Sequence, residues 1–432
     1  MGRKRYAQVG MGGRSWMYSH ALIDGFTEFA QLVGICDKNA GRLDYARRRI
    51  ADAGGGEVPA YGAEQFERMI AETKPDVVVV TTGPDVTHAD YTCRAMELGC
   101  DVISEKPMTV NADLCRKILT TRDRTGRNLR VTFNYRYSPP RSQVKRMLDA
   151  GAIGEVLSVD FTWMLDTRHG ADYFRRWHRK RANSGSLLVH KATHHFDLVN
   201  WWIGDRPVDV FGRGRRVFYT PQTADALGLT RRGDRCQGCP EAANCPFHLD
   251  LAAAERLKAL YLDCEQYDGY FRDRCVFAED VDIWDHMALN VRYQGGVLLN
   301  YMLTAHSPYE GYRIAFNGTT GRLEHQACEN TYINGDGSVP GELEKGKVSI
   351  TLIEQFSRPR EIEVELGRGG HGGGDPVLLT DLLHPDPPAD PLKRRADHRD
   401  GTYSIMIGIT GAASIDAGRV VAIDDLLGDA PL

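Results

Sequence analysis

The chain has 432 residues, of which 42% are hydrophobic, and its formal net charge is -4 at pH 7. This length is more than one typical domain needs, and the hydrophobic content excludes a disordered or fibrous chain. The balanced charge argues against nucleic-acid or membrane partners, and no apolar run approaches the roughly 18 residues of a membrane helix. The ten cysteines are scattered, and the N-terminus runs straight into a predicted strand. We therefore expect a cytoplasmic protein with reduced thiols and no secretory signal.

Short apolar segments alternate with amphipathic ones over residues 1–137. The segment DVVVVTT at 76–82 is almost purely β-branched, as expected for a strand buried on both faces. Strands that alternate with helices indicate βαβ units and hence a doubly wound, parallel Rossmann sheet. The predicted strands are 6–10, 32–36, 76–82, 101–104 and 130–134, and the predicted helices include 42–53, 88–98 and 111–126.

The pattern changes over residues 138–432, which we expect to form a second α/β domain. Apolar and polar residues alternate in its strands, which is typical of a sheet with one solvated face. We therefore predict an open, mainly antiparallel sheet and an α/β fold overall. The alternating segments are 156–164, parts of 287–303, 312–316 and 347–352; the insertions are 231–275 (cysteine-bearing) and 367–390; a closing helix covers 404–417.

A glycine-rich loop follows the first predicted strand and opens a helix, with the pattern Gly10-x-Gly12-x-x-Ser15. The first glycine permits a tight turn, and the second lets backbone N–H groups approach a pyrophosphate at the helix N-terminus. Ser15 is small enough to keep the helix close to the strand. The context predicts a dinucleotide site, and the alternative is a Rossmann sheet that has lost its nucleotide.

Asp37 ends the second predicted strand. A carboxylate at this place accepts hydrogen bonds from ribose hydroxyls and repels a 2′-phosphate, which favours NAD over NADP. Lys38 and Arg42 argue in the other direction, because their positive charges suit a 2′-phosphate.

Five features, in order, resemble the glucose–fructose oxidoreductase / inositol dehydrogenase / MocA family. They are the glycine loop, Asp37, the Thr-Gly-Pro-x-x-x-His stretch at 82–88, the Glu-Lys-Pro motif at 105–107 and the segment 185–197. The resemblance implies a nicotinamide at the domain junction, a sugar, inositol or related substrate, and a homodimer or homotetramer. The cofactor residues that it implies are Gly10, Gly12, Gly13, Arg14, Ser15, Asp37, Lys38, Thr82, Pro84, His88, Glu105 and Lys106.

The chain departs from the family pattern at one position. Many relatives carry an aspartate four residues before the histidine that matches His194, whereas this chain has His190 there, followed by Lys191. The sequence therefore leaves open which of these three side chains is the base. Asp197 matches the aspartate that follows the family histidine, and we expect it to brace the next helix.

The catalytic residues that we predict are Lys106, His194 and His190. Oxidation of a secondary alcohol removes a hydride, which the nicotinamide accepts, and a proton, which a side chain must accept. The Lys106 ammonium would polarise the developing alkoxide, His194 would be the base, and His190 would relay the proton or bind substrate. The alternative is a set of hydrogen-bonded histidines near a helix start, and we favour that interpretation for His195.

Further candidates for substrate binding flank these groups. A basic segment at 174–181 contains tryptophan and arginine, which stack on sugars and bind anions, although a charge run is usually a solvated face or subunit contact. A Gly-His-Gly loop at 370–372 resembles one that approaches the sugar in glycosidase-like relatives, and the alternative is a surface loop. The candidates are Arg136, Tyr137, Trp177, Arg179, Lys191 and His371. Packing at the domain junction is the alternative for Arg136 and Tyr137.

Cys236, Cys239 and Cys245 have a metal-like spacing and suggest a structural zinc site in the first insertion. A second CxxC pair is absent from the sequence. The sequence does not determine the fourth zinc ligand. Free thiols or a disulfide are the alternatives to a zinc site. The candidates for it are His248, Cys264 and Cys275.

The leading functional hypothesis is hydride transfer between NAD and a ring hydroxyl of a sugar or glycoside, with C3 favoured. In one variant the ketone and NADH are released. In the other, oxidation, elimination of the aglycone, water addition and re-reduction hydrolyse a glycoside, which could be anionic or sulfonated. A non-catalytic NAD sensor is the alternative class, and the sequence offers no nucleic-acid motif.

Overall fold

The computed structural model describes residues 2–329, 343–368 and 370–432. Its first sheet is parallel with strand order β3-β2-β1-β4-β5-β6, which confirms the predicted doubly wound arrangement. The strands are β1 Lys4–Val9, β2 Ala30–Asp37, β3 Ala60–Gly62, β4 Val77–Val80, β5 Asp101–Ser104 and β6 Leu129–Val131. The helical segments are α1 Ser15–His20, η1 Ala21–Gly25, α2 Ala40–Asp52, η2 Ala63–Gln65, α3 Phe66–Thr73, η3 Asp85–Thr87, α4 His88–Glu97, α5 Ala112–Thr125 and η4 Asn134–Tyr137.

Local sequence explains most of these boundaries. All four residues of β4 are buried valines, and Asn39 and Asn111 cap α2 and α5 by accepting N–H groups of the first turns. The predicted strand 130–134 is shorter than expected, because the chain turns into η4 after β6. That turn buries Arg136 against two carboxylates, a tertiary contact that the local pattern does not contain.

The second sheet has nine strands in the order β14-β13-β12-β11-β7-β10-β9-β8-β15. Only β7 and β10 pair in parallel among these neighbours, so the prediction of a mainly antiparallel sheet is confirmed. Exposed and buried residues alternate along β10, as expected for a sheet with one solvated face. The strands are β7 Val156–Asp166, β8 Pro207–Arg215, β9 His286–Tyr293, β10 Leu298–Ser307, β11 Glu310–Gly318, β12 Gly321–Glu329, β13 Leu343–Glu354, β14 Arg360–Ile362 and β15 Val421–Ala422.

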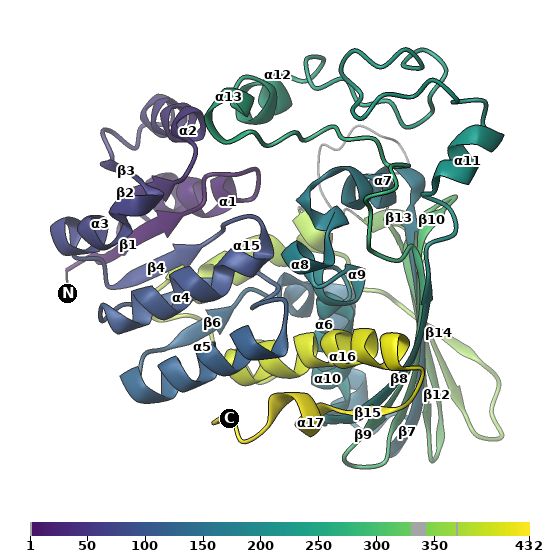
Figure 1. The fold of residues 1–432 in the computed structure, drawn as a ribbon. Coiled ribbons are helices and arrows are strands. Elements are labelled where there is room, and N and C mark those ends of the chain that lie inside the picture. Colours follow the sequence, from purple (N-terminus) through teal and green to yellow (C-terminus); the bar gives the residue numbers. More distant parts are fainter. Residues whose placement is uncertain (1, 330–342, 369) are drawn as a thin grey trace.

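Helices of the second half lie between the two sheets (Figure 1). α16 packs on β8 and α10 and also contacts β6 and α5, so the end of the chain joins both halves. It begins earlier than the predicted residue 404 because Asp397 and Asp400 form a capping box. The helical segments are α6 Pro139–Asp149, α7 Thr167–Arg175, η5 Trp177–Arg179, α8 Arg181–Ser184, α9 Leu187–His190, α10 Thr193–Ile203, α11 Pro221–Ala226, α12 Glu255–Leu257, η6 Lys258–Leu262, α13 Glu265–Asp268, α15 Gly370–Leu383, α16 His398–Ala417 and α17 Ile423–Leu427.

The two predicted insertions have different structures. The first reaches across to the Rossmann half, where α12 and α13 lie beside α2 (Figure 1). We call residues 255–272 of this insertion the strap. The second contains α15, whose backbone is left-handed at His371, Gly372 and Gly373 before the regular helix begins. None of the helices in the described ranges is long and apolar enough to cross a membrane.

Candidate active site

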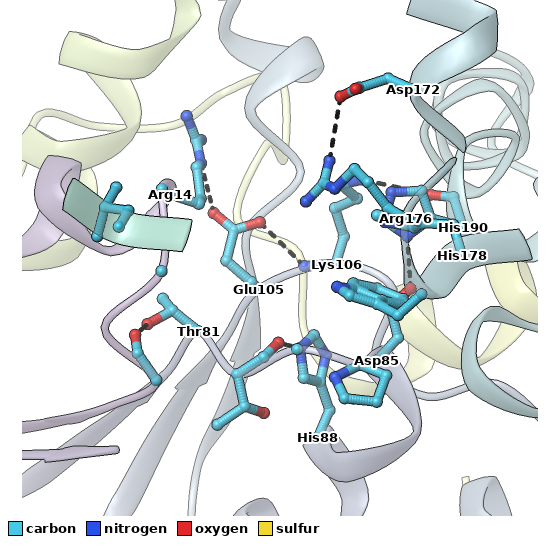
Figure 2. A pocket seen from close by; sticks show the side chains of 18 of the residues that line it. Arg14, Thr81, Asp85, His88, Glu105, Lys106, Asp172, Arg176, His178 and His190 are labelled. Carbon is cyan, nitrogen blue, oxygen red and sulfur yellow. Dashed lines mark hydrogen bonds and ion pairs between the residues drawn. The ribbon is translucent and has the colours of Figure 1, made fainter. Parts of the chain in front are cut away.

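A cavity of about 840 Å³ opens at the carboxyl ends of β1, β2, β4 and β5, facing the second half of the chain (Figure 2). Side chains from α7, α9, α10, α15 and the strap close its other sides. Ligands of doubly wound sheets bind at this edge, because the strand ends and the loops that follow them meet there. The cavity is therefore the candidate active site.

Gly10 and Gly12 have different surroundings in the loop after β1. Gly10 has a φ of +91°, and a Cβ there would lie 2.5 Å from the backbone nitrogen and Cα of Thr82. At Gly12, no heavy atom of the described residues lies within 4 Å of a Cβ position. Packing therefore requires the first glycine, whereas the second leaves open space for a pyrophosphate.

Asp37 is 7% exposed at the end of β2 and accepts hydrogen bonds from the backbone amides of Met11 at 2.6 Å and Asn39 at 2.8 Å. Arg42 lies 3.6 Å from Asp37 and forms a second ion pair with Asp268 of the strap. The Arg42 guanidinium is thus held by two carboxylates instead of facing a phosphate.

The strap lies over this end of the cavity. It contacts the glycine loop and the segment between β2 and α2, so a nucleotide bound there would lie beneath it. The contacts are the Gly13 amide to the Tyr261 hydroxyl at 3.3 Å, the Asn39 side-chain amide to the Cys264 carbonyl at 3.0 Å, and the Arg42–Asp268 ion pair.

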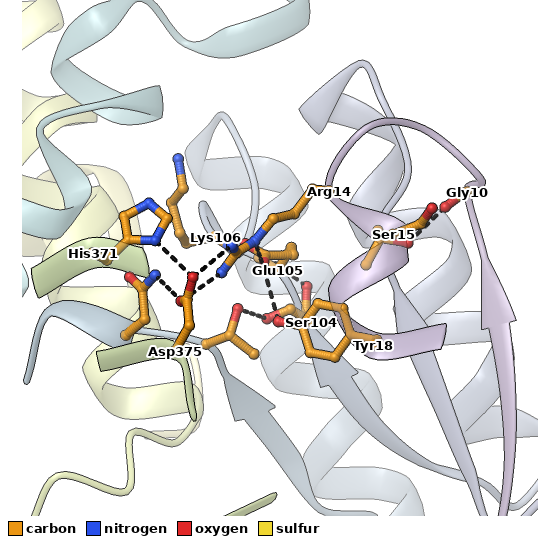
Figure 3. A network of polar contacts seen from close by, with 12 residues as sticks. Gly10, Arg14, Ser15, Tyr18, Ser104, Glu105, Lys106, His371 and Asp375 are labelled. Carbon is orange, nitrogen blue, oxygen red and sulfur yellow. Dashed lines mark hydrogen bonds and ion pairs between the residues drawn. The ribbon is translucent and has the colours of Figure 1, made fainter. Parts of the chain in front are cut away.

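Arg14 links three segments at one side of the cavity (Figure 3). Its Nε donates to Glu105 at 2.9 Å, and its terminal nitrogens donate to Asp375 at 3.2 Å. Asp375 also accepts from the Asn134 amide at 2.7 Å and contacts Nδ1 of His371 at 2.9 Å. Burial disfavours the charged form of Glu105, but Arg14 outweighs this and lowers the pKa of Glu105. The network fixes the glycine loop, the Glu-Lys-Pro motif and α15 relative to one another.

Lys106 follows β5, and its Nζ donates to the carbonyl oxygen of His190 at 3.3 Å. Burial lowers the pKa of Lys106 to about 8, although the negative charges of Asp85 and Glu105 oppose the shift. The side chain is therefore mainly an ammonium at pH 7, yet it gives up its proton far more readily than an ordinary lysine.

His190 ends α9, and its Nδ1 lies 2.5 Å from the carboxylate of Asp85 in η3, on the opposite wall of the cavity (Figure 2). Burial raises the pKa of Asp85 and lowers the pKa of His190, because each charged form is poorly solvated there. We expect the pair to hold one proton between carboxyl and imidazole.

His194 lies in the first turn of α10, with its ring stacked on Tyr135 at a centroid distance of 4.3 Å. Its Nδ1 is buried without a hydrogen-bond partner among the described residues. Burial, with the positive charges of Lys106 and Lys191, lowers the pKa of His194 well below its usual value. The ring is therefore neutral near pH 7, which is the state that a base requires.

Basic and aromatic side chains line the part of the cavity between the strap and the segment that follows α7. Arg272 of the strap forms a two-point ion pair with Asp172, both bonds at 2.8 Å, and Arg176 lies 3.5 Å from the same carboxylate. Trp177 stacks on His178 at a centroid distance of 3.6 Å. An aromatic face beside two guanidinium groups suits a sugar ring that carries a negative charge.

Comparisons with known proteins agree with this architecture. Residues 4–133 match the description "Oxidoreductase family, NAD-binding Rossmann fold", and residues 145–423 match "Oxidoreductase family, C-terminal alpha/beta domain". The chain belongs to the Gfo/Idh/MocA family. It is an NAD-binding oxidoreductase of the family that includes sugar and inositol dehydrogenases and glycosidases.

Two relatives and one solved structure illustrate the range of this family. YteT of Bacillus subtilis (strain 168), which carries an oxidoreductase name, is 35% identical over 94% of both chains. A "Glycosyl hydrolase family 109 protein" of Shewanella sp. (strain W3-18-1) is 26% identical over 88% of this chain and 76% of its own. The WlbA dehydrogenase of Bordetella pertussis, solved with NADH and UDP-GlcNAcA, shares the fold with a TM-score of 0.64 and 17% identity, over 98% of this chain and 99% of its own.

Most residues that the sequence assigns to the site, from the residues themselves or from the family resemblance, line the cavity. They come from both halves of the chain, as expected for a site at a domain junction. The assigned catalytic and substrate residues found there are Lys106, Trp177, His190, Lys191, His194 and His371. The assigned cofactor residues found there are Gly10, Gly12, Gly13, Arg14, Asp37, Lys38, Thr82, Pro84, His88, Glu105 and Lys106.

Four assigned residues do not line the cavity, and the structure gives each another task. Ser15 donates its hydroxyl to the Gly12 carbonyl at 2.7 Å and thereby closes the glycine loop. The three assigned substrate ligands are held in ion pairs or hydrogen bonds behind the cavity wall. These pairs are Arg136 with Asp197 at 2.6 Å and Asp400 at 2.9 Å, Tyr137 with Asp381 at 2.7 Å, and Arg179 with Asp280.

Several residues of the site are not apparent from the sequence. Asp85 lies inside the 82–88 stretch that supports the family resemblance. A carboxyl group directly after a conformationally restricted proline was the signal that could have identified it as a site residue. Arg176 belongs to the basic segment, in which Arg179 is the predicted ligand instead, since the sequence does not show which face of the turn meets the cavity. Tyr261 and Arg272 lie in the insertion, and nothing in the local pattern indicated that it folds over the site.

The predicted zinc ligands lie apart from the active site, in the first half of the insertion. In the described ranges, no three histidine, cysteine or acidic side chains are close enough as they stand to hold one metal ion. The five cysteines of the insertion form no disulfide with one another. Cys264, one candidate for the fourth ligand, lies in the strap instead, where its Sγ donates to the Ala259 carbonyl.

Proposed function

We propose that the protein oxidises a ring secondary hydroxyl of a sugar or glycoside, C3 being favoured, with NAD as the hydride acceptor. The observation that carries this proposal is the convergence of Lys106, His190 and His194 on one cavity whose opposite end is the glycine loop. Proton-handling groups and a dinucleotide loop in one cavity are what alcohol oxidation requires.

The residues present fit NAD. The open space at Gly12 and the N-terminus of α1 suit a pyrophosphate, and Asp37 suits the ribose hydroxyls. Arg42 is already paired with two carboxylates and therefore does not face a 2′-phosphate, which favours NAD over NADP, although the exposed Lys38 and Arg256 also line the cavity. When bound, the nicotinamide accepts a hydride and can return it.

Two side chains and one hydrogen-bonded pair would divide the proton chemistry. His194 is neutral and has an unpartnered Nδ1, so we assign it as the base that removes the hydroxyl proton. The Lys106 ammonium would stabilise the developing alkoxide. The His190–Asp85 pair would hold and relay a proton, with its carboxylate supplied by the Rossmann half in place of the aspartate that many relatives carry at position 190.

We favour the redox glycosidase variant of this reaction. Oxidation at C3 acidifies the C2 proton; its removal expels the aglycone from C1, water then adds at C1, and the ketone is reduced by the returned hydride. Atoms balance as hydrolysis, with no net NADH. The supports are the similarity to a glycosyl hydrolase family 109 protein and the strap, which lies over the nucleotide end of the cavity and favours a cofactor that stays bound.

The positive charge between the strap and the segment that follows α7 suggests a sugar with a negative charge. Trp177 offers a ring face for stacking, and Lys191 and His371 are positioned to contact hydroxyl groups. Arg176 and Arg272 share the single carboxylate of Asp172, so their combined charge is not fully neutralised by it. A carboxylated or sulfonated glycoside is the chemistry that such a pair selects.

The deciding experiment follows NADH absorbance and aglycone release in parallel, with purified protein, NAD and a panel of neutral and anionic glycosides and free sugars. Aglycone release without NADH supports the redox glycosidase. Accumulating NADH refutes that variant and supports a dehydrogenase. Silence in both channels, with NAD still bound, favours the sensor. Lys106→Met should abolish whichever signal appears, and Lys117→Met, on the exposed face of α5, is the matched control.

The predicted homodimer or homotetramer remains a proposal. Leu157 of β7 and Leu298 and Met302 of β10 are exposed large apolar side chains on neighbouring strands of the open sheet. A second copy that covers them would remove this apolar surface from water. Light scattering after size-exclusion chromatography measures the mass of the assembly, and a monomer at micromolar concentration would contradict the proposal.

A further inference from the structure

A second, small cavity of about 20 Å³ lies inside the first insertion, away from the active site. Four cysteines from two stretches of sequence line it: Cys236, Cys239, Cys245 and Cys275. Cys275 is distant in sequence, and a backbone bridge between Arg235 and Arg274 brings it to the others. The fold thus gathers four thiols around one space, although it places the other cysteine of the insertion, Cys264, elsewhere.

Each of the four sulfurs accepts a backbone N–H group. Two of these bonds run from the amide two residues further along the chain, an arrangement that turns a tight loop around the sulfur. Burial alone favours the neutral thiols and raises the pKa of Cys236, Cys245 and Cys275, and the amide donors would stabilise the negative sulfurs once a metal has displaced the protons. The donors to Cys236, Cys239, Cys245 and Cys275 are, in that order, the amides of Leu249, Gly233, Phe247 and Phe277.

The surrounding segment has no regular secondary structure of its own. Residues 227–254 form no helix or strand in the structure, apart from the single bridge. The apolar side chains at the cavity, with Phe247 and Phe277 at a ring distance of 5.4 Å, pack against the main hydrophobic core and do not form a separate core. Irregular segments without a core of their own commonly depend on a metal or disulfides for stability.

We propose that Cys236, Cys239, Cys245 and Cys275 bind a metal centre through four thiolates. Binding replaces four S–H bonds with four metal–sulfur bonds and releases the protons to solvent. The centre is structural, because it lies apart from the active-site cavity and shares no lining residue with it.

Two thiophilic centres share this chemistry: one zinc ion and an iron–sulfur cluster. As the described side chains stand, no three of them are close enough for one ion. Zinc therefore requires the thiols to turn inward, whereas a cluster spans a wider gap between its ligands. Metal analysis distinguishes the two directly.

The centre would also support the strap. Arg235, next to Cys236, pairs with Glu265 of the strap at 2.5 Å and with Asp273 at 2.7 Å. Loss of the centre should therefore loosen the segment that lies over the glycine loop and speed the release of NAD. This consequence rests on the proposed function, whereas the metal content of the protein does not.

The test measures zinc, iron and acid-labile sulfide in the full chain, purified without chelators and under anaerobic conditions. We expect about one zinc ion per chain, or iron and sulfide in equal amounts with visible absorbance. Cys245→Ser should lose the metal and unfold at a lower temperature, and Cys264→Ser, in the same insertion but outside the cavity, should keep it.

Because Cys245→Ser can fail to fold, the wild-type protein supplies a second measurement. A strong chelator should lower its melting temperature and expose four additional thiols to a thiol reagent, and zinc or iron with sulfide should reverse both changes. The proposal is overturned if the wild-type protein holds no metal before and after such reconstitution, or if these cysteines form disulfides. It is equally overturned if Cys264→Ser and Cys245→Ser lose metal alike.

Discussion

Replacing Gly10 by alanine should destabilise the whole fold. The new Cβ would lie 2.5 Å from the Thr82 nitrogen and Cα and 2.6 Å from the Thr81 carbonyl carbon, and these are backbone atoms of a central strand end. The φ of +91° adds conformational strain of about 1–2 kcal/mol for a residue with a side chain. With about 1–3 kcal/mol for overpacking, the free energy of unfolding should fall by about 2–5 kcal/mol.

Gly12→Ala is the matched comparison, since its Cβ meets no heavy atom of the described residues within 4 Å and its φ is not left-handed. Its stability without ligand should be close to that of the wild type. Its affinity for NAD should drop, because the methyl group occupies the space left for the pyrophosphate. A clash of about 1–3 kcal/mol corresponds to roughly 5- to 150-fold weaker binding.

Denaturant unfolding without ligand and NAD titration by calorimetry separate the two effects. The reasoning predicts opposite profiles: Gly10→Ala is mainly unstable, and Gly12→Ala is stable but binds poorly. Wild-type stability in Gly10→Ala would refute the steric account of the loop. Wild-type NAD affinity in Gly12→Ala would refute the placement of the pyrophosphate over this residue.

Three further predictions concern the site. If the Lys106 ammonium stabilises the alkoxide, the rate of hydroxyl oxidation should fall as pH rises through about 8. Lys106→Arg should move that fall to higher pH, and an unchanged pH–rate profile would contradict the role. Asp85→Asn should lower kcat by about 100-fold or more with a smaller change in KM, while Asp90→Asn, an exposed α4 position, should leave both unchanged. Asp37→Ala should weaken NAD more than NADP in binding titrations, and an unaltered ratio of the two affinities would remove Asp37 from cofactor selection.

The sequence alone was sufficient to predict the fold and to select residues that line one end of the cavity. A parallel strand, its turn and the following helix form from consecutive residues. Their signals can therefore be recognised from local spacing: buried valines, glycines that open a helix and a carboxylate at a strand end. The Glu-Lys-Pro motif and the histidine segment could be recognised for the same reason. Their meeting at one cavity follows from the topology of the sheet.

Tertiary structure decided what the remaining charged groups do. Arg136 and Arg179 carry guanidinium groups, which often bind ligands. In this fold, carboxylates from remote parts of the sequence pair with them behind the cavity wall. Asp85 meets His190 only because two separate elements face each other across the junction. The strap reaches the glycine loop from an insertion whose sequence pattern does not indicate that contact. The local sequence specifies the chemistry of a side chain, whereas its partner and its exposure depend on which remote segments pack against it.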